Sequence, residues 1–386
     1  MEIPAAMEVS AQSLETYYHL QQYLNVGWAL TQIVAIASML LIGLTSFGRS
    51  AFLSIAKVIK PWPLAAIVFY FSIALVVKVI QSTIIHHLMV KKSQVDESDA
   101  PSLLHFLAGE LPTILASALL LAVLGLALVF VLRRKNSLTW LWLAVIVTAI
   151  ASATLALNPY FSNTNSLGNA PSEQKIAQLL TRVGIPPNRI ATEDCSDSSD
   201  CPPGHVIGLG PTKTMLLDRR LTSRTPENQL LQVVAHEAKH FVLDNDLKPI
   251  LAIFLICSFV FLLTQLGVSA LQRRAHDQSE YVSLVPIAYG IGLAAFLLAQ
   301  PAVTTFQRNL ELEADRFGLE LNRDNRALID IMRADAKQNP MLYRYTPITK
   351  YFRATHPQIS DRIHLAETYQ PWLRGEPLKY RKYISN

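Results

Sequence analysis

The sequence predicts an α-helical multi-pass membrane protein of about six spans, with a polar α+β domain that a membrane hairpin divides into two parts. Two observations carry this prediction. Hydrophobic residues make up 51% of the 386 residues and charged residues only 16%, whereas an ordinary soluble domain has about 25% charged residues. The long apolar runs also form two groups, and a long polar region follows each group.

Six apolar runs are each long enough to cross the roughly 30 Å hydrocarbon core of a bilayer as a helix. They are Val26–Phe47, Pro63–Met89, Leu111–Leu132, Leu138–Leu157, Ile250–Ala270 and Val282–Val303. We therefore expect an N-terminal segment over residues 1–25, a four-span membrane domain over 26–157 and a transmembrane hairpin over 249–303. The second run carries Lys78, and a lysine inside a span is a candidate for function. A side chain that snorkels to the interface explains Lys78 equally well.

The two polar regions, residues 158–248 and 304–386, are expected to form the two parts of one domain. Helical periodicity runs from Ser172 to Val183. Two short strands, His205–Leu209 and Thr214–Leu217, follow between Gly and Pro residues. A strand edge beside an active helix can hold an extended peptide through main-chain hydrogen bonds. We read the basic tail after Pro371 as a disordered end, with binding to anionic lipid as the alternative.

The strongest chemical signal is the pattern His236-Glu237-Ala238-Lys239-His240 within an apolar, helix-periodic stretch. Residues four apart lie one turn above each other on a helix, so the two imidazoles face the same way and can hold one Zn²⁺. Glu237 is then placed to take a proton from a water molecule at the metal. This pattern arises by chance about 0.01 times in a chain of this composition.

A zinc ion in a hydrolase needs a third protein ligand and one open position. The candidate is Glu311, which we expect on the first helix after the sixth span. Asp315 lies four residues further on and can accept an N–H from one ligand histidine, which fixes the tautomer of that ring. Glu313 points elsewhere on the helix and is better read as a solvated or ion-paired residue.

The loop charges predict the orientation. If the loops alternate across the membrane, the positive-inside rule places the N-terminus and both polar regions outside. Cys195 and Cys201 bound a short acidic loop, and a disulfide there would suit an oxidising compartment. Two free thiols remain the alternative. The basic residues of the loops assigned to the inner side are Arg49, Lys57, Lys60, Arg133, Arg134, Lys135, Arg273 and Arg274.

These motifs resemble the integral-membrane zinc metalloproteases that include HtpX and the CAAX prenyl endopeptidase, a gluzincin type. The resemblance covers residues 172–366 and rests on four segments: Gly208–Lys213, Val234–His240, Glu311–Asp315 and His356–Ile363. It implies a zincin-like α+β metalloprotease domain with His236, His240 and Glu311 as ligands of one Zn²⁺ per chain.

The same resemblance implies the roles of the remaining site residues. Glu237 is the base, Asp315 supports a ligand histidine, His356 lies near the substrate carbonyl, and Arg362 braces the site. Pro203-Gly204 differs from the Asn-Ala that relatives usually have before the active-site strand. Relatives mostly keep their catalysis on the cytoplasmic side, so that side is the alternative to the outward orientation.

We therefore expect a zinc metalloendopeptidase in a bacterial inner membrane. Its partners are polypeptide substrates of the membrane and the lipid bilayer, and its role is protein quality control. The alternatives are a dedicated processing protease, such as one for prenylated C-termini, and a catalytically silent zinc-containing adaptor. The net charge of +5 belongs to loops beside the spans and forms no basic stripe for nucleic acid. The oligomeric state is not readable from the sequence.

Overall fold

The computed structural model describes residues 10–96, 98–162, 164–168, 170–194, 202–243 and 247–385. The chain forms two compact units. The membrane unit comprises Thr16–Ile146 and Leu255–Pro301, and the polar unit comprises Val147–Phe254 and Ala302–Asn386 with the short N-terminal segment Met1–Glu15. Cys195 and Cys201 lie outside the described residues, so the expected disulfide stays a prediction.

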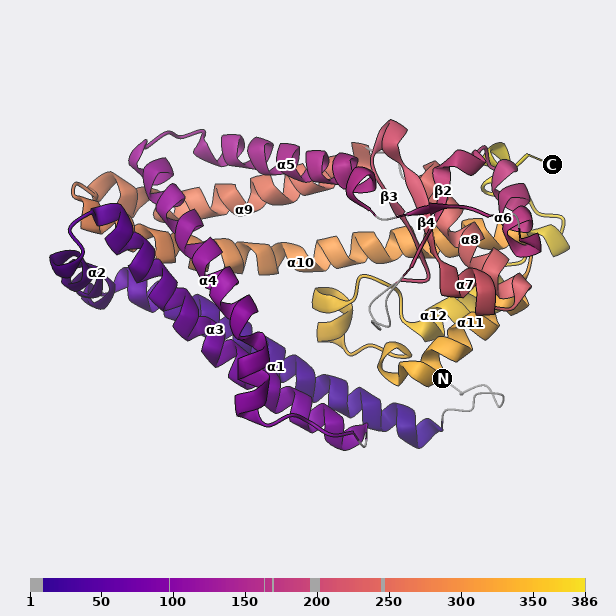
Figure 1. Ribbon diagram of the computed structural model, residues 1–386, viewed down its shortest axis with the longest axis horizontal. Coiled ribbons are helices and arrows are strands. Elements are labelled where there is room, and N and C mark those ends of the chain that lie inside the picture. The colour runs from indigo at the N-terminus through magenta and orange to yellow at the C-terminus, as the bar shows by residue number, and fades with distance from the viewer. Residues whose placement is uncertain are drawn as a thin grey trace. The chain divides into compact units, whose positions relative to one another are not determined.

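Six helices of the described chain are long and apolar enough to cross a membrane, which confirms the predicted multi-pass fold. Their large apolar side chains are exposed along much of their length, as expected for surfaces that face lipid. The membrane unit also contains one short helix, α2 (Ser46–Val58), between the first and second of these long helices. The six are α1 (Ala11–Leu44), α3 (Trp62–Val95), α4 (Leu103–Arg133), α5 (Thr139–Phe161), α9 (Leu247–Arg274) and α10 (Gln278–Asn322) (Figure 1).

Small residues let the helices of the membrane unit approach closely. α3 and α4 pack along each other, with Ala66, Ala118 and Ala122 fully buried. A Cβ on Gly125 of α4 would lie 2.7 Å from the ring of Tyr70 on α3. The Tyr70 hydroxyl in turn donates to the Val282 carbonyl of α10 at 2.9 Å. Van der Waals packing and such interhelical hydrogen bonds drive helix association in a bilayer, where the hydrophobic effect between helices is absent.

Two helices are longer than the hydropathy pattern indicated. α1 begins at Ala11, so it includes residues 11–25 of the expected N-terminal segment 1–25. We expected Glu311 on a separate helix after the sixth span, but α10 continues without a break to Asn322. Where the side chains change from apolar to polar, the surroundings of the helix change from lipid to water, but its backbone hydrogen bonds continue. Pro301 is accommodated within α10.

The polar unit contains a four-stranded sheet in the order β1-β2-β4-β3. The sequence reading missed β1 (Asn165–Ser166) and β2 (Ile190–Glu193), and placed the other two correctly within about two residues. β2 runs parallel to β4 (Thr214–Asp218), with Ile190 opposite Met215. β3 (Gly204–Ile207) is one of the two edge strands and runs antiparallel to β4, with Gly204 opposite Leu217 (Figure 1).

One apolar core holds the sheet against the motif helix α8 (Glu227–Leu243). Leu230, Val234 and Ala238 recur at intervals of four residues on the buried face of α8, which leaves the motif on another face. Helix α6 (Pro171–Thr181) and Phe317 of α10 complete this core. α7 (Arg219–Arg224) leads into α8, while α11 (Asn325–Gln338) and α12 (Ile359–Thr368) form a second small core with Leu319.

The C-terminal tail is ordered up to Ser385, contrary to the expectation of a disordered end. Glu320 on α10 is fully buried and accepts from the backbone N–H groups of Lys379 at 2.9 Å and Tyr380 at 2.8 Å. The Tyr380 ring packs edge-on against Phe317, with the ring centroids 5.3 Å apart. The basic side chains of the tail gave no sign of these contacts, because they depend on one buried carboxylate far away in the sequence.

Candidate metal centre

Helix α8 presents the two motif histidines side by side. His236 and His240 are one turn apart, and their ring centroids lie 5.3 Å from each other. Both side chains are largely buried, with 12% and 19% of their surface exposed. The neighbouring residues Ala235 and Ala238 pack into the core beneath the sheet, so the opposite face of the helix carries the imidazoles.

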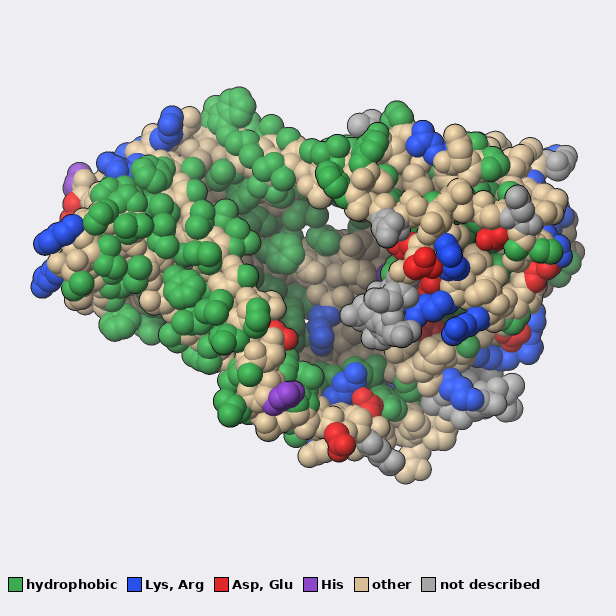
Figure 2. Space-filling view, viewed as in Figure 1, with side chains coloured by type: hydrophobic (Ala, Val, Ile, Leu, Met, Phe, Trp, Pro, Cys, Tyr) green, Lys and Arg blue, Asp and Glu red, His purple; other side chains and the backbone are tan. Residues whose placement is uncertain are grey.

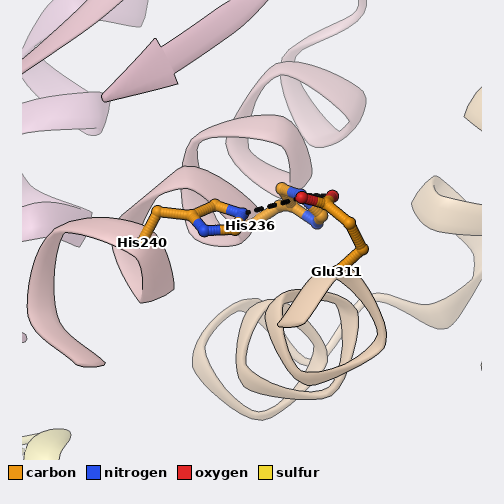
Figure 3. A group of neighbouring side chains, drawn as sticks. All are labelled: His236, His240 and Glu311. Carbon is orange, nitrogen blue, oxygen red and sulfur yellow. Dashed lines mark ion pairs between the residues drawn. The ribbon is translucent and has the colours of Figure 1, made fainter. Parts of the chain in front are cut away.

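Helix α10 brings Glu311 onto these two rings (Figure 3). One carboxylate oxygen lies 3.2 Å from Nε2 of His236, and the other lies 3.6 Å from Nε2 of His240. The three ligand atoms all lie within 4.8 Å of one another. These are the three residues that the sequence analysis named as ligands, although 71 positions separate His240 from Glu311 in the numbering.

The donor set fits a zinc ion. Two ligand atoms held at 2.0–2.1 Å from one tetrahedral zinc lie about 3.3 Å apart. The distances of 3.2 and 3.6 Å between the carboxylate and the imidazole nitrogens match that spacing. Two nitrogens and one carboxylate leave the fourth tetrahedral position for water or substrate. This open fourth position distinguishes a catalytic zinc site from a structural one, in which the protein supplies all four ligands.

A buried ion pair fixes the first imidazole. Asp315 is fully buried and lies 2.9 Å from Nδ1 of His236, which donates to it. Arg362 donates to both Asp315 oxygens, from Nε at 2.7 Å and from Nη2 at 2.6 Å. Because Nδ1 is engaged with Asp315, Nε2 is the nitrogen that faces Glu311, and it can bind a metal ion once it has given up its proton. The bidentate arginine satisfies the carboxylate that burial would otherwise penalise.

The electrostatics of the site favour a cation. Burial by itself lowers the pKa of His236, but hydrogen bonds to Asp315 and Glu311 outweigh burial and raise that pKa to about 10. The carboxylates around the ring therefore create a strongly negative potential. Burial also lowers the pKa of His356, against the attraction of Glu311. The same negative potential that raises the pKa of His236 would also attract a divalent cation to the Nε2 atoms of the two histidines.

Glu237 lies where α8 faces the edge strand. Burial raises the pKa of its carboxyl above the ordinary value, while the neighbouring histidines oppose that shift. A Cβ on Gly204 of β3 would lie only 3.1 Å from Cγ of Glu237. Because Gly204 has no side chain, the strand backbone can pass close to the Glu237 side chain.

His356 reaches the cluster from a separate loop. Its Nε2 lies 3.6 Å from a Glu311 oxygen, and its ring is more exposed than the two motif imidazoles. Just before it, a π-helical turn spans Thr349–Arg353. The seven residues named from the sequence are therefore brought together here: His236, Glu237, His240, Glu311, Asp315, His356 and Arg362.

Arg308 holds the loop of His356 and was missed by the sequence analysis. It is 7% exposed on α10 and donates from Nη1 to the carbonyls of Lys350 and, at 2.8 Å, Ala354. Thr304 of the same helix donates to the Tyr351 carbonyl at 2.7 Å. No motif surrounds Arg308 in the sequence, so only the fold reveals this role.

Gly318 permits the close approach of α10 to α8 and was also missed. A Cβ at this position would lie 3.1 Å from the backbone nitrogen of His236 and 3.0 Å from Nε2 of Gln232. A backbone atom cannot move aside as a side chain can. The available signal was a glycine in the interior of a helix, where it costs about 1 kcal/mol relative to alanine and so needs a packing reason.

We predict that Gly318→Val weakens zinc binding by about tenfold and destabilises the chain by about 1–3 kcal/mol. The added methyl groups push α10 away from α8, so Glu311 no longer meets both imidazoles. Zinc affinity of the purified full chain in detergent, measured by competition with a chelator, checks this. Gly109→Val is the matched control, because a Cβ on Gly109 meets nothing within 4 Å. Equal zinc affinities of the two variants would contradict the assignment of Gly318.

Comparison with known proteins supports the same reading. The model of peptidase family M48 matches residues 166–370. The uncharacterized metalloprotease YhfN of Bacillus subtilis is 22% identical over 251 residues, which cover 62% of this chain and 58% of that protein. The CAAX prenyl protease 1 homolog of Dictyostelium discoideum is 24% identical over 255 residues, covering 63% of this chain and 58% of the relative. The chain thus spans somewhat more than half of the length of these curated relatives.

A solved structure shares the fold. The crystal structure of S. mikatae Ste24p matches with a TM-score of 0.53 and 16% sequence identity, over 94% of this chain and 99% of that one. The family match spans more than half of the 386 residues and includes all three proposed zinc ligands and the base. It confirms the resemblance inferred from the motifs: the chain belongs to peptidase family M48.

Proposed function

We propose that this protein is a membrane-embedded zinc metalloendopeptidase that hydrolyses peptide bonds of membrane or membrane-associated polypeptides. One observation carries the proposal: two imidazoles and one carboxylate converge at the spacing of a tetrahedral zinc site, with Glu237 beside them. His236, His240 and Glu311 hold one zinc ion per chain. A zinc ion bound there supplies a Lewis acid that acidifies water and polarises the scissile carbonyl.

Glu237 moves the proton. Its buried carboxyl has a raised pKa, which makes the carboxylate a better base than an exposed glutamate. The carboxylate takes the proton of the attacking water and later hands it to the leaving amine. Such proton transfer is typically worth about 10²–10⁴-fold in rate. The intact base also argues against a silent adaptor, because a purely structural zinc site has no use for a carboxylate at this place.

His356 stabilises charge on the substrate. Its exposed ring faces the cluster, so Nε2 can donate to the oxygen of the scissile carbonyl as negative charge develops there. One such donor typically contributes about 2.7–4 kcal/mol. Arg308 fixes the turn that carries His356, while Arg362 and Asp315 orient the His236 ring.

The edge strand supplies a place for the substrate backbone. Among the described residues β3 pairs with β4 alone, so its other edge keeps unpaired N–H and C=O groups. Gly204 at its start lies against Glu237. A polypeptide that adds a strand to this edge gains main-chain hydrogen bonds irrespective of its side chains. Such recognition suits broad quality control of misfolded membrane proteins.

We predict that Glu237→Gln abolishes peptide cleavage by at least about 10³-fold while leaving the zinc content unchanged. The amide keeps the shape of the carboxylate but cannot accept the proton, and residue 237 is no zinc ligand. Cleavage of an unfolded model polypeptide by the purified chain, together with metal analysis, checks this. Cleavage by the variant at the wild-type rate would show that another group is the base.

The relatives favour a second candidate function. Three of them are named CAAX prenyl protease 1 homologs, so this chain can instead process one class of prenylated precursor. Proteomic comparison of cells with wild-type protein and with Glu237→Gln separates the two. Accumulation of many unrelated membrane proteins supports quality control, and accumulation of one precursor class supports dedicated processing.

We further propose that the polar unit lies on the outer face of a bacterial inner membrane. Three loops that the positive-inside rule assigns to the inner side are tied to one another within the membrane unit. Lys135 donates to the Ala275 carbonyl at 3.2 Å, and Arg49 pairs with Asp277 at 2.6 Å. Their position at one end of the unit supports the alternation used in the charge count. The alternative is the opposite orientation, with the polar unit in the cytoplasm.

Single cysteines test this orientation in a chain whose Cys195, Cys201 and Cys257 are replaced by serine. Asn188→Cys is exposed in the polar unit, and Ser137→Cys is exposed in the loop between α4 and α5. We predict that a membrane-impermeant maleimide labels position 188 in cells with a permeabilised outer membrane and an intact inner membrane. It labels position 137 only after lysis. The reverse pattern would place the polar unit in the cytoplasm.

A further inference from the structure

Hydrogen bonds join two loops of the membrane unit, and we call the two joined loops the platform. These are the loop between α4 and α5 and the loop between α9 and α10. Gln272 of α9 donates to the Leu132 carbonyl at 2.6 Å, and Gln265 donates to the Ser137 carbonyl at 2.9 Å. A third hydrogen bond, from Lys135 to the Ala275 carbonyl at 3.2 Å, joins the two loops directly. The ends of α4 and α9 therefore meet at one side of the membrane unit.

This platform carries a basic cluster, defined as Arg133, Arg134, Lys135, Arg273 and Arg274. All five side chains are exposed. Within residues 98–162 and 247–385 as described, none of the four guanidinium groups forms an ion pair, whereas Arg49 at the same end pairs with Asp277 and Glu280. Figure 2 shows Lys and Arg side chains gathered at the left end of the membrane unit, where Figure 1 places these loops.

An apolar cavity of about 450 Å³ reaches the residues next to the cluster, because Leu132, Asn136 and Gln272 line it. Asn136, Gln265 and Gln272 supply polar groups at its loop end. From there its wall on α4 runs from Leu132 to Leu121, a rise of about 17 Å along the helix. One leaflet contributes about 15 Å of hydrocarbon. The cavity therefore reaches from the headgroup level to about the middle of the bilayer.

The cavity opens toward the surrounding lipid. Leu124 and Tyr289 line it and remain 55% and 40% exposed. Almost all other lining side chains are apolar and come from α3, α4, α5, α9 and α10. An unfilled apolar space leaves its wall without contact partners. In a membrane, the molecules that can enter such a space sideways are lipids.

We propose that this platform and cavity form a binding site for an anionic phospholipid. One acyl chain fills the cavity along α4, and the phosphate lies against the basic cluster. The arginines can bind the anionic headgroup without first breaking another ion pair. The polar groups of Asn136, Gln265 and Gln272 at the end of the cavity can bind the glycerol region. The lipid bridges both loops and so strengthens the contact between α4 and α9. This site is separate from the metal centre and lies entirely within the membrane unit.

Native mass spectrometry of the delipidated full chain in detergent tests the headgroup. Phosphatidylglycerol and phosphatidylcholine with identical acyl chains are the probes. We expect the wild type to retain phosphatidylglycerol about tenfold more than phosphatidylcholine, and Arg273→Gln/Arg274→Gln to lose this preference. Lys57→Gln/Lys60→Gln removes the same charge from two exposed positions, in the last turn of α2 and just after it, and keeps the preference. Equal retention of both lipids by the wild type, or equal behaviour of the two double variants, overturns the proposal.

A second pair of variants tests the cavity. Leu128→Trp places a large ring in the lined space, whereas Leu120→Trp adds the same ring on the lipid-exposed surface of α4. We expect the first to reduce phosphatidylglycerol retention about tenfold and the second to leave it unchanged. Size-exclusion chromatography verifies that both variants fold. Unchanged retention in folded Leu128→Trp overturns the placement of the acyl chain.

Discussion

The contact between α8 and α10 is the constraint on which the rest of the site depends. One helix carries the two imidazoles and the other carries Glu311, so the donor set exists only while these helices touch. Gly318 lets the two backbones approach. Buried Asp315 then links the helices through the His236 ring. The network is expensive to break, because each of its charges would be left buried without a partner.

The buried Asp315–Arg362 pair also ties a third element to the metal centre. Arg362 belongs to α12, which packs with α11 in the small core around Leu319. Arg308 independently fastens the turn before His356 to α10. Substrate-facing groups are thus held by rigid helices at positions remote in sequence. Sites of this kind need support within a few tenths of an ångström, and packing of locked side chains provides it.

Local spacing explains why so much of the site could be predicted from the sequence. The interval of four between His236 and His240, and again between Glu311 and Asp315, defines a helix face without knowledge of the fold. The six spans follow from apolar runs long enough for a bilayer. The comparisons confirm the predicted family and fold.

What the sequence did not predict depends on contacts between distant segments. Strands β1 and β2 are too short to show alternation. The continuity of α10 is hidden because hydropathy changes where the helix does not end. Glu320 holds the C-terminal tail through backbone groups, which leave no trace in side-chain patterns. Gly318 and Arg308 are single residues whose meaning appears only when α10 is placed against its neighbours.

The central claim is one zinc ion held by two imidazoles and one carboxylate. X-ray absorption spectroscopy at the zinc edge of the purified full chain, with metal quantification, tests it most directly. The account predicts one zinc per chain with only nitrogen and oxygen ligands, the nitrogens at about 2.0–2.1 Å. Absence of stoichiometric zinc, or a sulfur ligand at about 2.3 Å, would contradict it.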